Sequence, residues 1–309
     1  TSSRLPRRRV VTTSRDRSIR VWAADRGDCA AMLEGHRGAV RAVAFAPHGR
    51  TLASGAADAV ARVWDASSGR CLRVLAGHIG EIRAVAYSLT GSVLATAADD
   101  RTTRLWAVER GGGCVHVLVG HRSPVWALAF MHGQLITASI DETAKVWSVT
   151  SGECLATLEG HGAAVCSVAC GATVVATGSW DGTVKLWSSE NWACQLSLVG
   201  RQAVQVRCVA FSPDGRLLAV GSDDHVTRMW DTEDARCVGA LVGHRDYIQA
   251  VCFSRDGRWV ATASDDHTAK VWDADTRDCV LTLRGRGVRG QNARQSRRGR
   301  AGSRGFSAQ

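Results

Sequence analysis

The stretch GHRGAVRAVAFAPHGRTLASGAADAVARVWD, residues 35–65, decides the fold. It opens on Gly-His and closes on Trp-Asp, and apolar residues alternate with other residues between these two pairs. Together with the residues that follow it, the stretch contains four short runs separated by turn residues: AVRAVAF at 39–45, TLASGA at 51–56, VARVW at 60–64 and CLRVL at 71–75. Alternation of this kind predicts short β-strands, and no segment shows a useful helical period.

The same unit recurs along the chain with steps of 40 to 43 residues. Seven tryptophans mark it: Trp22, Trp64, Trp106, Trp147, Trp187, Trp230 and Trp272. Six residues before each stands an aspartate: Asp16, Asp58, Asp100, Asp141, Asp181, Asp224 and Asp266. Gly-His precedes five of these aspartates, and Gly200-Arg201 takes its place once. Self-similarity with a period of about 40 residues predicts a repeat architecture.

These features resemble the WD40 repeat family over residues 10–283. The resemblance implies an all-β, seven-bladed β-propeller, with four-stranded blades around a central channel. Trp-Asp itself survives at only three of the seven tryptophans, Trp64, Trp230 and Trp272. Residues 1–9 are then a basic stub, and residues 284–309 an Arg/Gly-rich tail that we expect to be disordered.

The first unit lacks one strand in the sequence. It begins directly in RVVTTS, residues 9–14, and residues 1–8 are too basic to form the innermost strand. The tail shows no alternating run that would replace it. We therefore expect the first blade to lack its innermost strand and the chain to be a fragment of a longer one. The alternative is a ring with an incomplete first blade.

The resemblance also implies a buried hydrogen-bonded set in each blade, made of the Gly-His histidine, a second-strand Ser or Thr, the turn aspartate and the tryptophan. An indole N–H, a hydroxyl, an imidazole and a carboxylate can satisfy one another in that order. The five complete tetrads are His36, Ser54, Asp58 and Trp64; His78, Thr96, Asp100 and Trp106; His121, Thr137, Asp141 and Trp147; His161, Thr177, Asp181 and Trp187; and His244, Thr262, Asp266 and Trp272.

The sixth unit has lost the histidine and the hydroxyl together, since Arg201 and Val220 stand at their positions. A relay that kept only one of them would leave a buried polar group unsatisfied, at a cost of roughly 1–3 kcal/mol. We interpret Arg201 as a structural substitution that reaches Asp224 directly.

Catalytic and metal chemistry are not expected. A Ser, His and Asp constellation that recurs five times is a framework element rather than a single active site. The loops SDDHV at 222–226 and SDDHT at 264–268 are interpreted as polar turns. The sequence has no Cys-x-x-Cys zinc pair, phosphate-binding loop or dinucleotide fingerprint. We predict no enzyme activity, no cofactor and no small-molecule substrate.

Partner-binding residues are predicted on the Gly-His face, around the mouth of the channel, as the resemblance implies. Two kinds of position point there: the residue before each turn aspartate, and those three and five past the histidine. An apolar group from neighbouring blades comprises Pro124, Trp126, Ile140 and Trp180. The other candidates are Arg41, Glu81, Arg83, Asp99, Arg207, Asp223, Tyr247 and Asp265. Exposed aromatic and arginine side chains favour protein contacts, whereas packing of these rings on adjacent loops is the alternative.

Charge and cysteine content bound the partners and the compartment. The net charge of +10 arises from four arginines in residues 1–9 and eight in residues 284–309, which leaves the body at about −2. A nucleic-acid contact is therefore expected only through the tail. Seven of the eleven cysteines recur once per repeat, too far apart to bridge, which indicates a reducing compartment, the cytoplasm or nucleus. No apolar run of about 20 residues predicts a membrane span.

The sequence thus predicts a non-enzymatic scaffold for protein–protein interactions, docking partners within a multiprotein complex. Two alternatives stay open: a reader of histone tails or other basic peptides at the channel mouth, and an RNA-associated protein that uses its tail.

Overall fold

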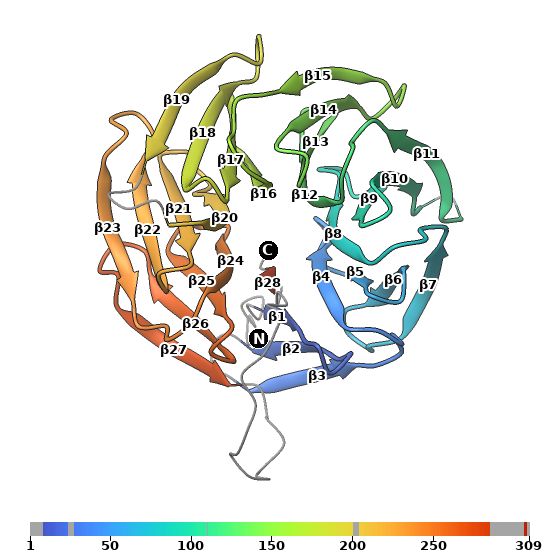
Figure 1. Cartoon of the computed structure of the whole chain (residues 1–309). Helices are drawn as coiled ribbons and strands as arrows, with labels where there is room; N and C mark the ends of the chain where they lie inside the picture. Colours follow the sequence, from blue (N-terminus) through green and yellow to red (C-terminus); the bar gives the residue numbers. More distant parts are fainter. Residues whose placement is uncertain (1–8, 24–27, 110, 200–203, 285–305, 308–309) are drawn as a thin grey trace, which may run out of the picture.

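The computed structural model describes residues 9–23, 28–109, 111–199, 204–284 and 306–307. Seven four-stranded antiparallel sheets are arranged as blades around a central axis (Figure 1). The predicted all-β, seven-bladed propeller is confirmed. The described residues contain no helix that is long and apolar enough to cross a membrane.

In six blades the strands follow one another from the innermost to the outermost position, and in the first blade β1 to β3 take the three outer positions. The first three blades contain β1 (Arg9–Thr13), β2 (Ile19–Ala23) and β3 (Cys29–Leu33); β4 (Val40–Phe45), β5 (Thr51–Ala56), β6 (Val60–Asp65) and β7 (Cys71–Ala76); and β8 (Ile82–Tyr87), β9 (Val93–Ala98), β10 (Thr102–Ala107) and β11 (Gly113–Val119).

The next two blades contain β12 (Val125–Met131), β13 (Gln134–Ser139), β14 (Ala144–Ser148) and β15 (Cys154–Leu158); and β16 (Val165–Cys170), β17 (Val174–Ser179), β18 (Thr183–Ser188) and β19 (Cys194–Val199). The last two contain β20 (Val206–Phe211), β21 (Leu217–Ser222), β22 (Val226–Asp231) and β23 (Cys237–Val242); and β24 (Ile248–Phe253), β25 (Trp259–Ser264), β26 (Thr268–Asp273) and β27 (Cys279–Arg284).

The first blade has three strands of its own, as predicted, and its innermost position is taken by β28 (Phe306–Ser307). In this antiparallel pairing Val11 lies opposite Ser307, and Thr12 lies opposite Phe306. A two-residue strand is too short for any alternation to predict. The whole tail, residues 284–309, was expected to be disordered. Instead, Arg284 ends β27 and residues 306–307 form β28, whereas residues 285–305 and 308–309 lie outside the described part.

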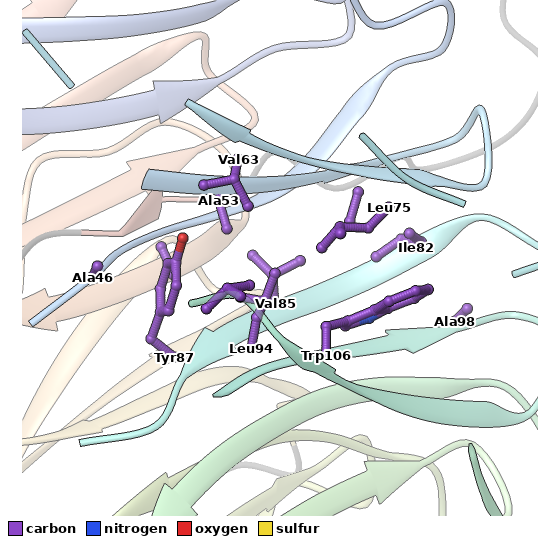
Figure 2. Close-up of a cluster of buried hydrophobic side chains, with 13 residues drawn as sticks. Ala46, Ala53, Val63, Leu75, Ile82, Val85, Tyr87, Leu94, Ala98 and Trp106 are labelled. Carbon is purple, nitrogen blue, oxygen red and sulfur yellow. The ribbon is translucent and has the colours of Figure 1, made fainter. Parts of the chain in front are cut away.

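The core consists of apolar layers between neighbouring blades. Figure 2 shows the layer between the second and third blades, where Val63 and Leu75 face Ile82 and Trp106. Burial of side chains of this size contributes about 1.5–3 kcal/mol each. The blades approach so closely that a Cβ on Gly55 would overlap the Ile82 side chain. Glycine is therefore required there by the close approach.

Candidate functional site

Each tetrad joins a tryptophan near the end of the third strand to the loop that enters the blade. In the second blade the Trp64 indole donates to Ser54 Oγ at 2.8 Å, and Ser54 Oγ lies 2.7 Å from His36 Nε2. The other ring nitrogen, His36 Nδ1, lies 3.0 Å from the Asp58 carboxylate. Asp58 also accepts from the Arg37 backbone N–H at 2.8 Å. The set therefore ties the Gly-His loop to the β5–β6 turn.

The structure brings together the same kinds of side chain in the four other tetrads. The central hydroxyl of each belongs to a threonine that is completely buried: Thr96, Thr137, Thr177 or Thr262. Histidine Nε2 lies 2.7–2.8 Å from the threonine oxygen, and Nδ1 lies 2.8–3.0 Å from the aspartate.

The same threonine oxygen also serves the tryptophan of its blade. Trp106 donates to Thr96 at 2.9 Å, and Trp187 donates to Thr177 at 2.8 Å. The corresponding bonds to Thr137 and Thr262 are 2.8 Å long. A neutral histidine protonated on Nδ1 satisfies every member, because the hydroxyl then donates to Nε2.

The protonation states follow from burial and hydrogen bonding. Burial lowers the pKa of the rings of four tetrad histidines, which keeps them neutral: His36, His78, His161 and His244. Burial alone would raise the pKa of Asp181, but hydrogen bonds from Thr183 and the Gly162 N–H lower it to about 2. The pKa of Asp266 is also about 2, because bonds from Thr268 and His244 outweigh burial.

The two blades without a Gly-His histidine satisfy their turn aspartate in another way. Arg20 donates to Asp16 at 2.8 Å, and Arg228 donates to Asp224 at 2.5 Å. In both cases the arginine lies four residues after the aspartate, on the third strand. The predicted contact of Arg201 with Asp224 lies outside the described residues.

The candidate partner site is built on a recurrent bulge of the innermost strand. In six blades the register between the first and second strands shifts by one residue. The residue without a partner in the register is always the one near the Gly-His end: Arg41, Arg83, Trp126, Cys166, Arg207 or Gln249. Bulges re-aim a side chain, and the sequence alternation did not reveal them.

Five predicted residues form one continuous row, which we call the belt: Arg83, Trp126, Trp180, Arg207 and Tyr247. The Arg83 guanidinium lies 5.5 Å from the Trp126 ring centroid, and Trp126 meets Trp180 edge-on at 5.1 Å. Arg207 lies 5.3 Å from the Trp180 centroid and 5.5 Å from that of Tyr247. Cations over aromatic faces at such distances attract the ring.

Aspartates hold the two belt arginines in place. Arg83 donates to Asp99 through Nε at 2.8 Å and through Nη2 at 2.6 Å. Arg207 donates to Asp223 in the same forked way, at 2.5 and 2.9 Å. Although burial alone would lower the pKa of both arginines, these carboxylates raise it. Both guanidiniums are thus fixed cations over the aromatic rings.

The remaining candidates extend or flank the belt. Glu81 accepts from Arg41 at 2.9 Å and lies 3.4 Å from Arg83. Asp265 accepts from the Gln249 amide at 2.8 Å. Pro124 and Ile140 are joined through their backbones at 3.1 Å.

The two belt tryptophans are half-buried, whereas the sequence suggested exposed rings. The reason is that each ring packs against the other and against an arginine. Their indole N–H groups are buried and have no hydrogen-bond partner within the described part of the chain. His225, which stacks on Tyr247 with centroids 5.8 Å apart, was not predicted as a partner-site residue, because its SDDH loop was interpreted as a polar turn.

The two SDDH loops are committed to neighbouring side chains. Asp223 and Asp224 pair with arginines, Asp265 with Gln249, and Asp266 with His244. Among the residues that the structure describes, no group of three or more His, Cys, Asp or Glu could hold a metal ion.

A ring of seven four-stranded blades, five of them tied by the same polar tetrad, defines a repeat propeller of the protein-interaction type. The family described as "WD domain, G-beta repeat" matches residues 27–65, 69–107, 112–148, 152–188, 192–231 and 235–273. These matches cover most of the chain, which therefore belongs to the WD40 family. Propellers of this family generally serve as scaffolds for protein interactions.

A curated relative is similar over a short part of the chain. It is the nuclear distribution protein PAC1 of Mycosarcoma maydis, 47% identical over 45 residues. The alignment covers 15% of this chain and 10% of the relative.

Proposed function

We propose that this chain is a non-enzymatic docking platform that binds partner proteins through the belt, as part of a multiprotein complex. The observation that carries the proposal is the row of Arg83, Trp126, Trp180, Arg207 and Tyr247, which runs across five blades and takes no part in the tetrads. Tryptophan, tyrosine and arginine dominate binding hot spots in protein interfaces.

Preorganisation supports this role. The two arginines of the belt are already fixed by Asp99 and Asp223, so a partner would order few side chains on binding. The belt also holds two indole N–H groups that have no acceptor among the described residues, and a partner carbonyl would satisfy such donors after a small ring movement.

The tetrads support a non-enzymatic role. Their hydroxyl groups are buried, and each is committed both to an indole and to an imidazole. A nucleophilic hydroxyl must instead reach a substrate.

The test is quantitative affinity capture with the full chain from its native cells, comparing wild type with Trp180→Ala. Loss of a hot-spot ring weakens the affinity for a partner by roughly tenfold or more, so that this partner is depleted from the captured proteins. The matched control is Leu89→Ala, an exposed residue on the opposite face. Equal capture by all three proteins would refute the belt as the docking site.

A second candidate function, recognition of basic peptides, is supported by Asp265. The side chain that bonds to Asp265, Gln249, is neutral, whereas Glu81, Asp99 and Asp223 each face an arginine cation. Arginine- and lysine-rich peptides titrated against Asp265→Asn and Trp180→Ala distinguish the two: the basic-peptide reader loses affinity with the first variant, and the platform with the second.

The free state of all eleven cysteines supports a reducing compartment, and we place the protein in the cytoplasm or nucleus on this ground. RNA association through the tail involves residues outside the described part of the chain. Deletion of residues 284–309 followed by RNA crosslinking tests it.

A further inference from the structure

One cationic residue occupies the same third-strand position in every blade, two residues before the tryptophan. In three blades it is a lysine that donates to the hydroxyl of the residue directly opposite it on the outer strand, at 2.9–3.0 Å: Lys145 to Thr157, Lys185 to Ser197 and Lys270 to Thr282. In the first and sixth blades it is an arginine paired with the turn aspartate, as described above. Five of the seven cations therefore have an oxygen partner within their own blade.

The two exceptions are Arg62 and Arg104, in the second and third blades. The outer-strand residues opposite them are Val74 and Val117, which offer no oxygen. The nearest polar contacts are to cysteine sulfur, 3.7 Å from Arg62 and 3.9 Å from Arg104. The Nε–H of each guanidinium is buried and has no hydrogen-bond partner within the described residues. A buried donor without an acceptor is costly.

The third blade adds an exposed apolar strip beside its arginine. On β11, Val117 lies opposite Arg104 and Val119 lies opposite Thr102, while Val115 is the residue that the register skips at the bulge; Val115, Val117 and Val119 are 53%, 44% and 72% exposed. Ile79 is 91% exposed. Its backbone N–H bonds to Asp100, two residues before Thr102, which lies opposite Val119. Ile79 therefore lies near the Gly-His end of this blade, toward which the valines run. In the other four tetrads the residue after the histidine is arginine or glycine.

The outer edge of the third blade is also open for backbone pairing. β11 is the last strand in its sheet, and its seven residues make it longer than every other outer strand described. It contains no Lys, Arg, Asp or Glu, the residues with which edge strands commonly block pairing.

We propose that this edge, made of Ile79, Arg104, Val115, Val117 and Val119, is a second docking site, which takes an extended acidic segment of a partner protein. The segment adds a strand to β11, its apolar side chains cover the valines, and one carboxylate accepts from Arg104. The carboxylate supplies the oxygen that Thr157, Ser197 and Thr282 supply to the lysines of their own blades.

Charge complementarity favours this occupant over a second copy of the chain. Antiparallel pairing of two β11 strands about Val117 would match valine with valine. It would also place the two Arg104 guanidiniums beside one apolar strip with no carboxylate between them, which is unfavourable.

The test uses the full chain and a phage-displayed library of random nine-residue peptides. The decisive variant is the double substitution Arg104→Lys and Val117→Thr, which gives the third blade the Lys–Thr pair that the fourth and seventh blades already contain. Because that pair satisfies itself, we expect the variant to fold normally. We expect the wild type to select acidic, β-branched peptides, and the double variant to bind them roughly tenfold or more weakly in fluorescence anisotropy.

Each other outcome overturns the site. Selected peptides that lack acidic residues, or that bind both proteins equally, exclude it. A peptide lost with Trp180→Ala but kept by the double variant binds at the belt, which supports the proposed function and not this edge. Concentration-dependent dimers in sedimentation that Val117→Lys abolishes would assign the edge to a second copy.

Discussion

The carboxylate of Asp224 accepts a hydrogen bond from Arg228 at 2.5 Å, in a blade that has no Gly-His histidine. The side chains are 33% and 24% exposed for arginine and aspartate, so solvent screens the pair only in part. We expect Arg228→Ala to lower the free energy of unfolding by about 0.5–1 kcal/mol. Arg104→Ala, which removes an arginine with no oxygen partner in the described part of the chain, should change the free energy of unfolding by less than about 0.5 kcal/mol. Urea titration measures both, and a larger loss for Arg104→Ala would contradict this account.

Restoring one tetrad member in the sixth blade should bring no gain. Arg201→His alone is expected to leave the melting temperature unchanged or lower, because Val220 offers the new imidazole no hydroxyl. Combining it with Val220→Thr supplies both middle members and should raise the melting temperature above that of either single variant. Calorimetry of the three variants decides it; a clear rise with Arg201→His alone would refute the requirement for a hydroxyl.

The hydroxyl at the centre of a tetrad can be tested in the fourth blade. Thr137→Val keeps the side-chain shape but removes the oxygen that serves both Trp147 and His121. The loss of two partners for buried groups should cost roughly 1–3 kcal/mol in urea unfolding. Thr137→Ser is the control, since Ser54 fills this role in the second blade. Equal stability of the valine and serine variants would show that the hydroxyl contributes little.

Stability should fall in two steps on acidification. Below pH 6.5 the unfolded histidines take up protons while buried His36, His78, His161 and His244 resist, so unfolding binds protons and stability declines. A second decline follows between the unfolded aspartate value of 3.8 and the folded values of about 2 at Asp181 and Asp266.

Urea midpoints at pH 8, 6, 5 and 3 measure this dependence. His244→Gln removes one titrating group and should reduce the slope of stability between pH 7 and 5 relative to the wild type. A urea midpoint that rises as the pH is lowered from 7 to 5 would contradict the assignment of neutral histidine rings.

Thiol reactivity should separate two classes of cysteine. Burial raises the pKa of Cys166 and Cys170 to about 12, and it also raises that of Cys208. Iodoacetamide at pH 8 should therefore spare these three in the native protein. It should modify exposed outer-strand thiols such as Cys154 and Cys237. Peptide mapping after a short pulse of iodoacetamide gives the extent of labelling at each cysteine. Early labelling of Cys166 would contradict the expected protection and show that the innermost strand opens.

The tetrads were predictable because the Ser or Thr, the aspartate and the tryptophan recur at constant spacing, so Asp58 and Trp64 identify their counterparts in every unit. The belt residues were predicted as positions but not as contacts. Arg207 meets Trp180 and Tyr247 from different blades, and no local pattern encodes which side chains meet across blades. The bulges and the pairing of β28 with β1 depend on backbone register, which single residues do not reveal.

A second bulge lies in every blade at the tryptophan, where the outer strand skips one residue against the third strand. Because bulges increase strand twist, the curvature of the outer wall is set by main-chain geometry at seven matching points. The curvature of the wall therefore does not depend on the side chains that point outward from it. Evolution can diversify one blade's exterior for a new partner while the toroid keeps its dimensions.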